Sequence, residues 1–126
     1  MTDELVRKVG PRAAKRLSAF AKNARAMSPL PVQEVLLFGS RARGDARQGS
    51  DWDVAVVVSD SNDINAQKAR RSALKVFADI ALADIATGFH LRPIVVPVAE
   101  ATSHRVTRRV SPGLARNLRA DGLPIP

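Results

Sequence analysis

Two short groups of residues in this sequence have the types and spacing that phosphate chemistry needs. Gly39 and Ser40 directly follow an apolar run, and ten residues separate Ser40 from Asp51, which opens a second apolar run together with Asp53. Exposed backbone N–H groups at a turn that leads into a helix can hold a polyphosphate. Two carboxylates two residues apart on a strand lie on the same face, because side chains alternate with a period of two. Both can therefore reach one divalent cation, and Mg²⁺ bridging phosphates is the usual case.

Each of these residues has an expected role. Gly39 has no side chain, so the backbone can approach a phosphate closely there. Ser40 can donate its hydroxyl and its N–H to a phosphate oxygen, although a helix cap is its commoner role when it stands alone. Asp51 and Asp53 would ligate Mg²⁺ and link it to a triphosphate. Two carboxylates this close repel each other unless a cation lies between them, which disfavours a purely structural role for the pair.

The joined Gly-Ser and Asp-x-Asp pattern resembles the signature of the DNA polymerase β-type nucleotidyltransferase superfamily. Within that superfamily the chain is most similar to the small bacterial minimal nucleotidyltransferases, known as MNT proteins. The specific part of the resemblance runs from about Val32 to Val58. It is carried by residues of the turn, the following loop and the second apolar run, which are Gly39, Ser40, Arg41, Arg43, Gly44, Asp51 and Asp53.

The resemblance implies an enzyme that uses Mg²⁺, or Mn²⁺, to move a nucleoside monophosphate from an NTP to an acceptor hydroxyl, with ATP as the expected donor. Asp51 and Asp53 are then the catalytic carboxylates and the metal ligands. Arg41 and Arg43 could contact phosphates or an acidic partner, and a solvated loop position is the alternative for both. Nucleotide binding is thus expected of four residues of the turn, which are Gly39, Ser40, Arg41 and Arg43.

The third strand of the superfamily usually carries a further carboxylate that helps to activate the attacking hydroxyl, and this sequence departs from that pattern. The corresponding run, Leu91 to Val98, contains no acid. Glu100 follows just past it and has the parity to share a face with Ile94 and Val96, so it is the available substitute as a catalytic residue. Catalysis that is weak or depends on a partner is the resulting expectation.

The resemblance also implies a partner. Minimal nucleotidyltransferases often pair with helical HEPN ribonucleases and act as antitoxins, in some cases by adenylylating the toxin. A HEPN-type toxin is therefore the expected partner and carrier of the acceptor hydroxyl. The alternative is a catalytically degenerate module that binds nucleotide, or neutralises such a partner, without turnover. Nucleic acid is a weaker candidate, because five aromatic residues supply few platforms for base stacking.

Composition sets the frame for these hypotheses. The 126 residues suffice for one nucleotidyltransferase-like domain spanning 1–126, and 45% apolar residues fit a globular protein. Without cysteines there are no disulfides or thiolate metal sites, and without a signal-like or membrane-spanning apolar run a cytoplasmic protein is expected.

The net charge of +8 is unevenly distributed along the chain: residues 1–31 hold seven basic residues against two acids, whereas residues 32–60 hold three against five. The acids thus concentrate where a metal would lie.

The apolar periodicity predicts the elements that position these residues. Residues 3–27 should be helical with a break at Gly10-Pro11, and Val32–Phe38 should form a strand. A short helical turn at Ser40–Gly44 precedes a central strand, Asp53–Val58. The later elements are a helix to about Thr87, an edge strand at Leu91–Val98 broken by prolines, a weak helix at 100–109 and a helix from Ser111-Pro112 to Asp121-Gly122.

This order predicts an α/β fold of two layers, with a small mixed sheet and helices packed on it. One face of the long helix should be buried, and it comprises Leu74, Phe77, Ala78, Ala81 and Ile85. A single core should bury five large residues of the sheet and this helix, which are Phe38, Val54, Val56, Phe77 and Ile94.

Overall fold

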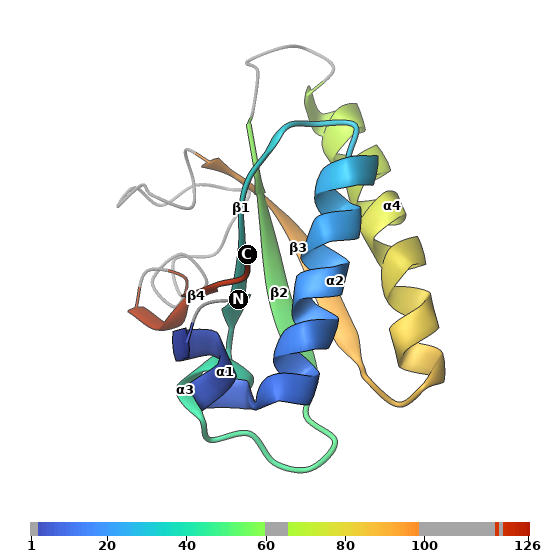
Figure 1. The fold of residues 1–126 in the computed structure, drawn as a ribbon. Helices are drawn as coiled ribbons and strands as arrows, with labels where there is room; N and C mark the ends of the chain where they lie inside the picture. Colours follow the sequence, from blue (N-terminus) through green and yellow to red (C-terminus); the bar gives the residue numbers. More distant parts are fainter. Residues whose placement is uncertain (1–2, 60–65, 99–117, 119) are drawn as a thin grey trace.

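A four-stranded sheet with helices on one face forms the body of the protein (Figure 1). The computed structural model describes residues 3–59, 66–98, 118 and 120–126. The helices are α1 (Asp3–Val9), α2 (Pro11–Met27), α3 (Ser40–Arg43) and α4 (Ala66–Ala86). The strands are β1 (Val32–Phe38), β2 (Trp52–Val58), β3 (Leu91–Pro97) and β4 (Leu123–Pro124). The predicted α/β fold of two layers with a mixed sheet is confirmed.

The break between α1 and α2 lies where the sequence predicts it. Gly10 has φ +85°, and its N–H donates to the carbonyl of Val6 at 2.8 Å, which closes α1. Pro11 then occupies the first turn of α2, where its missing N–H removes no hydrogen bond. At the other end of α2, the N–H of Ser28 donates to the carbonyl of Ala24 at 2.9 Å. Gly10 and Pro11 thus break one run of helical apolar periodicity into two helices, α1 and α2.

The strand order β3-β2-β1-β4 places β2 in the interior of the sheet, as predicted from its apolar residues. β1 is antiparallel to β2, whereas β3 is parallel to it. A parallel neighbour needs a long crossover, and α4 supplies it between β2 and β3. Residues 54–58 of β2 are all buried, as expected for a strand with neighbours on both sides and apolar contacts on both faces.

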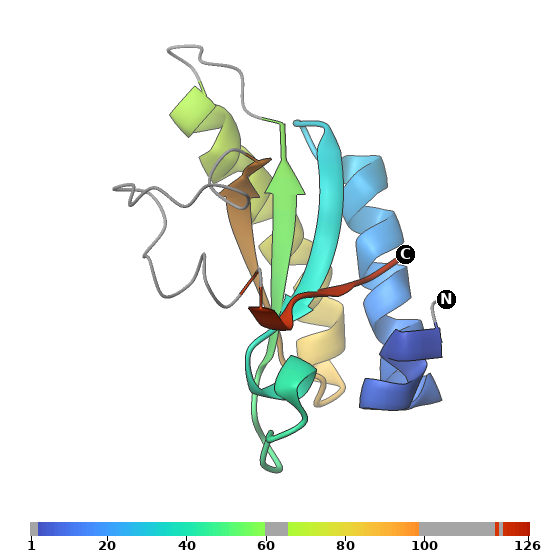
Figure 2. The ribbon, with the colours of Figure 1, turned by 90° about the vertical axis from the view of Figure 1, so that its left-hand side faces the viewer.

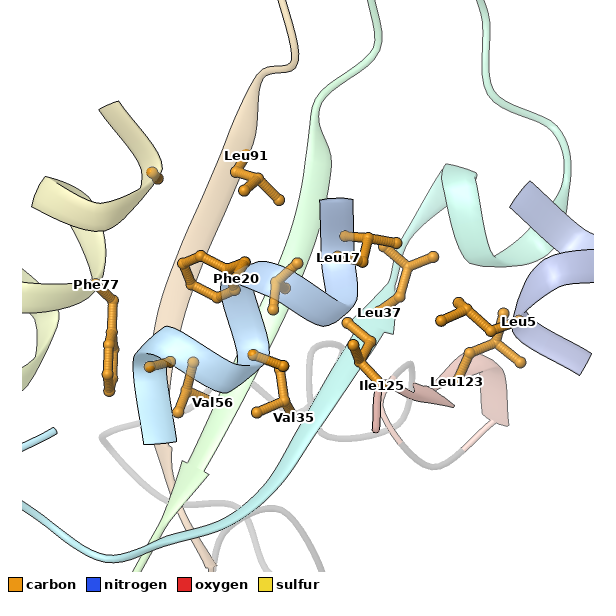
Figure 3. Close-up of a cluster of buried hydrophobic side chains, with 14 of the residues drawn as sticks. Leu5, Leu17, Phe20, Val35, Leu37, Val56, Phe77, Leu91, Leu123 and Ile125 are labelled. Carbon is orange, nitrogen blue, oxygen red and sulfur yellow. The ribbon is translucent and has the colours of Figure 1, made fainter. Parts of the chain in front are cut away.

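The core lies on both faces of the sheet, so the expectation of one core is wrong. Val54, Val56 and Phe77 belong to the larger cluster, between the sheet and α1, α2 and α4 (Figure 3). Phe38 and Ile94 are partly buried against a smaller cluster on the opposite face. The reason is strand parity, because alternate residues of a strand point to opposite faces. The smaller cluster consists of Leu36, Ala55, Val57, Val96 and Leu118.

The buried face of α4 is also shifted from the predicted one. Ala73, Phe77 and Ala81 are buried, whereas Leu74 is 42% exposed and Ile85 is 37% exposed. The buried positions follow a strict i, i+4 spacing, and the two alanines bring the helix close to the sheet on either side of Phe77. Ala78, which was assigned to the buried face, is exposed.

The prolines of β3 occupy positions that cost the sheet no hydrogen bond. The N–H of Trp52 donates to the carbonyl of His90 at 2.8 Å, and Trp52 pairs with Leu91. In a parallel pair this register directs the backbone N–H and C=O groups of the even-numbered residues of β3 toward β2. The backbone N–H and C=O groups of the odd-numbered residues point away from β2. Pro93 and Pro97 therefore lie on the outer edge, where a missing N–H makes the edge a poor template for another strand.

The C-terminal residues add a short strand that periodicity does not predict. β4 pairs antiparallel with β1, and the N–H of Ile125 donates to the carbonyl of Val35 at 2.8 Å (Figure 2). The predicted helix at 100–109 and most of the predicted helix from 111 to 122 lie outside the described residues. Among the helices that the structure describes, none is both long and apolar enough to cross a membrane.

Candidate active site

The register of β2 brings the two halves of the Gly-Ser and Asp-x-Asp pattern together. Asp53 pairs with Phe38, the last residue of β1, across the antiparallel pair. Gly39 comes directly after Phe38, so the turn begins beside the Asp53 carboxylate. A Cβ built on Gly39 would lie 2.7 Å from Oδ2 of Asp53. The backbone of the turn and the carboxylate are therefore in direct contact, and no larger residue fits between them.

The turn itself depends on the backbone of Gly39. Its φ of +76° and ψ of −158° lie in a region that is open essentially to glycine alone. Its carbonyl accepts hydrogen bonds from the N–H groups of Ala42 and Arg43, both at 3.1 Å, and this starts α3. The N–H of Ser40, in the first turn of α3, has no acceptor within the helix. In the described part of the chain the Ser40 hydroxyl has no hydrogen-bond partner either, so both groups are available to a ligand.

Arg41 holds the loop between α3 and β2. Its Nη2 and Nε donate to the carbonyl of Ser50 at 2.9 and 3.3 Å. Its guanidinium carbon lies 4.4 Å from the centroid of the Trp52 ring, which is a cation–π distance. Trp52 in turn stacks on Phe89, with 4.7 Å between the ring centroids, and packs against the larger cluster on the face away from the carboxylates. Through these contacts Arg41 fixes the position of the loop that carries Asp51.

Arg43 connects the turn to two acids outside the carboxylate pair. Its Nε lies 3.2 Å from Oδ2 of Asp45, and its Nη1 lies 3.7 Å from Oδ2 of Asp121. The hydrogen bond and the negative charge of Asp45 raise the pKa of Arg43. Arg43 therefore ties α3 to the following loop and to the C-terminal segment.

Asp51 and Asp53 lie on the face of the sheet opposite α2 and α4. Ala55 and Val57 have the same parity as the two aspartates, and both belong to the smaller cluster on that face. The Asp51 side chain is half exposed and Asp53 is partly buried. Burial raises the pKa of Asp53, the charge of Asp51 raises it further, and the charge of Arg92 opposes both. The pair is therefore a site where negative charge is concentrated at the edge of a low-dielectric core.

Arg92 is a residue of this site that the sequence reasoning missed. It pairs with Asp53 across the parallel β2–β3 pair, and its Nη1 lies 3.9 Å from Oδ2 of Asp51. Ile94 and Val96 share its parity and belong to the cluster on the carboxylate face. Aligning the first residues of the two predicted strands would have placed Asp53 beside Leu91, one position from Arg92.

Neither Glu100 nor the two aspartates of α4 take a described part in the site. Glu100 lies outside the described residues. β3 runs away from Asp53, and its last residue, Pro97, pairs with Val58 at the far end of β2. Asp79 and Asp84 are on α4, which packs on the opposite face of the sheet.

Comparison with known proteins agrees with this geometry. A family model of the nucleotidyltransferase domain matches residues 17–101, which is more than half of the chain and includes the whole Gly-Ser and Asp-x-Asp pattern. The chain belongs to the nucleotidyltransferase domain family. The resemblance inferred from the sequence is thereby confirmed at the level of the family. Among curated proteins, none matches the chain.

Two solved structures share the fold of this nucleotidyltransferase domain. One is a toxin-antitoxin with AMP-PNP, with 19% identity, a TM-score of 0.51 and coverage of 86% of this chain and 71% of that one. The other is a mutant of the toxin-antitoxin MntA-HpeT, in which two aspartates two positions apart are changed to glutamate. It is 18% identical, with a TM-score of 0.50 and the same coverages. At these identities the likeness is one of fold.

The residues of this domain fit a divalent cation whose ligands come partly from the protein and partly from a nucleotide. The described residues contain no group of three or more His, Cys, Asp or Glu that could form a complete protein cage for a metal. Mg²⁺, however, is commonly held by one or two carboxylates, with substrate phosphates and water completing its shell. Asp51 and Asp53 share one face and Asp53 lies beside the turn at Gly39, so the two carboxylates could supply that donor set.

Replacing Asp53 with asparagine is expected to stabilise the ligand-free protein at neutral pH. The raised pKa means that the fold favours the neutral carboxyl, so this stabilisation is present below the ordinary pKa of 3.8 and is lost as the pH rises through the folded-state pKa. Asparagine is neutral throughout, so the Tm of the variant should exceed that of the wild type at pH 7. The two should converge below about pH 3, where Asp53 is largely protonated in both the folded and the unfolded protein. Thermal unfolding across this range tests the sign, with Asp79→Asn, at an exposed position of α4, as the control.

Proposed function

We propose that this protein is a Mg²⁺-dependent nucleotidyltransferase that moves a nucleoside monophosphate from ATP to a hydroxyl of a partner protein. The observation that supports it most is the contact between the turn at Gly39 and the carboxylate of Asp53. A phosphate-binding turn and a metal-binding carboxylate must adjoin if both are to hold one metal–triphosphate complex. Family membership supplies the reaction class, which is nucleotidyl transfer.

In this proposal the described residues bind and orient the donor. The backbone at Gly39 and the N–H and hydroxyl of Ser40 contact phosphate oxygens, and Asp51 and Asp53 hold the cation. When bound, Mg²⁺ would offset the negative charge that builds up on the leaving pyrophosphate. The acceptor oxygen forms a bond to the α-phosphorus, the α–β phosphoanhydride bond breaks, and the hydroxyl proton passes to solvent. Positioning and electrostatics carry most of the catalysis in such transfers.

The proposed acceptor is carried by a toxin-type partner. The two solved structures compared above are toxin-antitoxin structures, and one contains AMP-PNP, an analogue of ATP. The resemblance to minimal nucleotidyltransferases suggests a HEPN-type toxin. The basic N-terminal region, residues 1–31, would suit an acidic surface on that partner.

The second candidate function is a module that neutralises the partner without turnover. The placement of Arg92 favours it, because the β3 position beside Asp53 holds a guanidinium where a carboxylate would complete the acidic site. Such a module would still bind nucleotide through the turn.

Calorimetry with ATP and Mg²⁺ tests the site. The double variant Asp51→Asn/Asp53→Asn should weaken binding by at least about 10–100-fold, the loss caused by removing even an outer-sphere partner of a metal ligand, because here the metal loses both carboxylates. The variant Asp79→Asn/Asp84→Asn removes two carboxylates from α4 and should bind as the wild type does. Circular dichroism confirms that each variant is folded. Equal affinity in the wild type and the first double variant would refute the metal role of the pair.

Label transfer separates the two candidate functions. The protein and a co-purified partner are incubated with ATP labelled at the α-phosphate and Mg²⁺. Label on the partner, lost in Asp51→Asn/Asp53→Asn, is the result expected of a transferase. A stable complex that stays unlabelled while ATP still binds would support the module without turnover.

A further inference from the structure

Arg92 places a positive charge beside the carboxylates of the site. It is the β3 neighbour of Asp53 in the parallel register, and its Nη1 lies 3.9 Å from Oδ2 of Asp51. All three side chains have the same parity and lie on the face of the sheet opposite α2 and α4. The guanidinium thus lies close to the carboxylate of Asp51, and its strand position is beside Asp53, the pair that would hold a cation.

The nearby arginines of the turn are placed differently. Arg41 is bound to the carbonyl of Ser50 and lies over the ring of Trp52. Arg43 is paired with Asp45 and Asp121. The Arg92 side chain, by contrast, is 71% exposed, and among the described residues its one ion pair is the 3.9 Å contact with Asp51, so it can leave the carboxylates without disrupting packing among those residues.

We propose that the guanidinium of Arg92 acts as a counter-charge that competes with the divalent cation for Asp51 and Asp53. When a nucleotide binds, the guanidinium moves from the carboxylates to the phosphates. This inference deepens the proposed function and rests on it. A guanidinium binds phosphate oxygens in a bidentate manner, and this interaction is stronger than a long contact to an exposed carboxylate. The metal alone therefore binds weakly, and metal and nucleotide bind cooperatively.

A site held by a counter-charge behaves differently from a site that has lost its metal ligands. A degenerate site would bind the metal poorly because it lacks ligands, and removing Arg92 would not improve it. A site held by a counter-charge binds the metal better once the charge is removed. The gain should be about 5–10-fold for an exposed charge roughly 4 Å from a carboxylate, because solvent screens most of the interaction.

Binding of Mn²⁺ alone, measured by the electron paramagnetic resonance signal of the free ion, tests the competition. Arg92→Gln should bind Mn²⁺ about 5–10-fold more tightly than the wild type at low salt, and the gain should shrink at high salt. Arg92→Lys keeps the charge and should stay near the wild type. Arg71→Gln removes an equal charge from an exposed position of α4 and should leave the affinity unchanged.

Repeating the titration with AMP-PNP present tests the cooperativity. AMP-PNP should tighten Mn²⁺ binding more in the wild type than in Arg92→Gln, because the variant has no guanidinium to be drawn away. Wild-type binding of Mn²⁺ with no gain in Arg92→Gln would overturn the role of Arg92 and leave the proposed function standing. Absence of Mn²⁺ binding in the wild type, in Arg92→Gln and with AMP-PNP would overturn both.

Discussion

Replacing Phe77 with alanine is expected to lower the free energy of unfolding by about 3–5 kcal/mol, as for other large aromatic side chains removed from a core. Phe77 is fully buried on α4 and belongs to the cluster that joins this helix to β2 (Figure 3). The alanines one turn on either side, Ala73 and Ala81, are buried too and too small to fill the resulting cavity. Chemical denaturation followed by circular dichroism measures the loss.

Leu82 provides the matched control for this prediction. It lies on the same helix and is 60% exposed, so Leu82→Ala should change the free energy of unfolding by less than about 0.5 kcal/mol. A loss below about 1 kcal/mol for Phe77→Ala, or equal losses for the two variants, would contradict the placement of α4 on the sheet.

The difficulty of predicting the buried face of α4 has a physical cause. This helix carries apolar residues around much of its circumference, so several stripes satisfy the helical period. Leucine is more hydrophobic than alanine, which favours a stripe through Leu74. The structure buries Ala73 rather than Leu74, together with Phe77 and Ala81, because small residues allow the helix axis to approach the sheet. Phe77 and Ala81 belong to both stripes, which is why their burial could be predicted from the sequence.

Local patterns were sufficient for the elements that hold the Gly-Ser and Asp-x-Asp pattern. The apolar runs predict β1 and β2, and Gly10-Pro11 predicts the break between α1 and α2. These features depend on residues close together in the chain, so propensity and periodicity capture them. The order of elements then limits the fold to a mixed sheet with helices on it.

Such local patterns do not predict how distant segments of the chain pair with one another. Arg92 follows Asp53 by 39 positions, and its place beside that carboxylate depends on the register of a parallel pair. A shift by one residue would direct Arg92 to the opposite face of the sheet. β4 has two residues and pairs with β1 more than 80 positions earlier, so it has no periodicity to detect. The site was therefore predictable where it lies along one hairpin, and not where a third strand enters it.

Replacing Gly39 with alanine is expected to lower the free energy of unfolding by about 2–5 kcal/mol, which combines backbone strain with overpacking. Alanine rarely adopts the φ of +76° and ψ of −158° found there. Its Cβ would also lie 2.7 Å from Oδ2 of Asp53, and 3.6 Å from Cβ of that residue. The carboxylate must move to relieve the contact, so nucleotide–metal binding should weaken even at temperatures where the variant is folded. Denaturation and calorimetry with Mg²⁺-ATP measure the two effects.

Gly10 separates the two causes. It has a similar backbone conformation, φ +85° and ψ 162°, but a Cβ built on it meets no atom within 4 Å. Gly10→Ala should therefore show the strain alone, about 1–3 kcal/mol, and leave nucleotide binding intact. The further loss in Gly39→Ala should shrink when Asp53 is also replaced by alanine, because that change removes the closest atoms. Equal losses for Gly39→Ala and Gly10→Ala, with binding unaffected in both, would show that the turn and the Asp53 carboxylate are not in contact in solution.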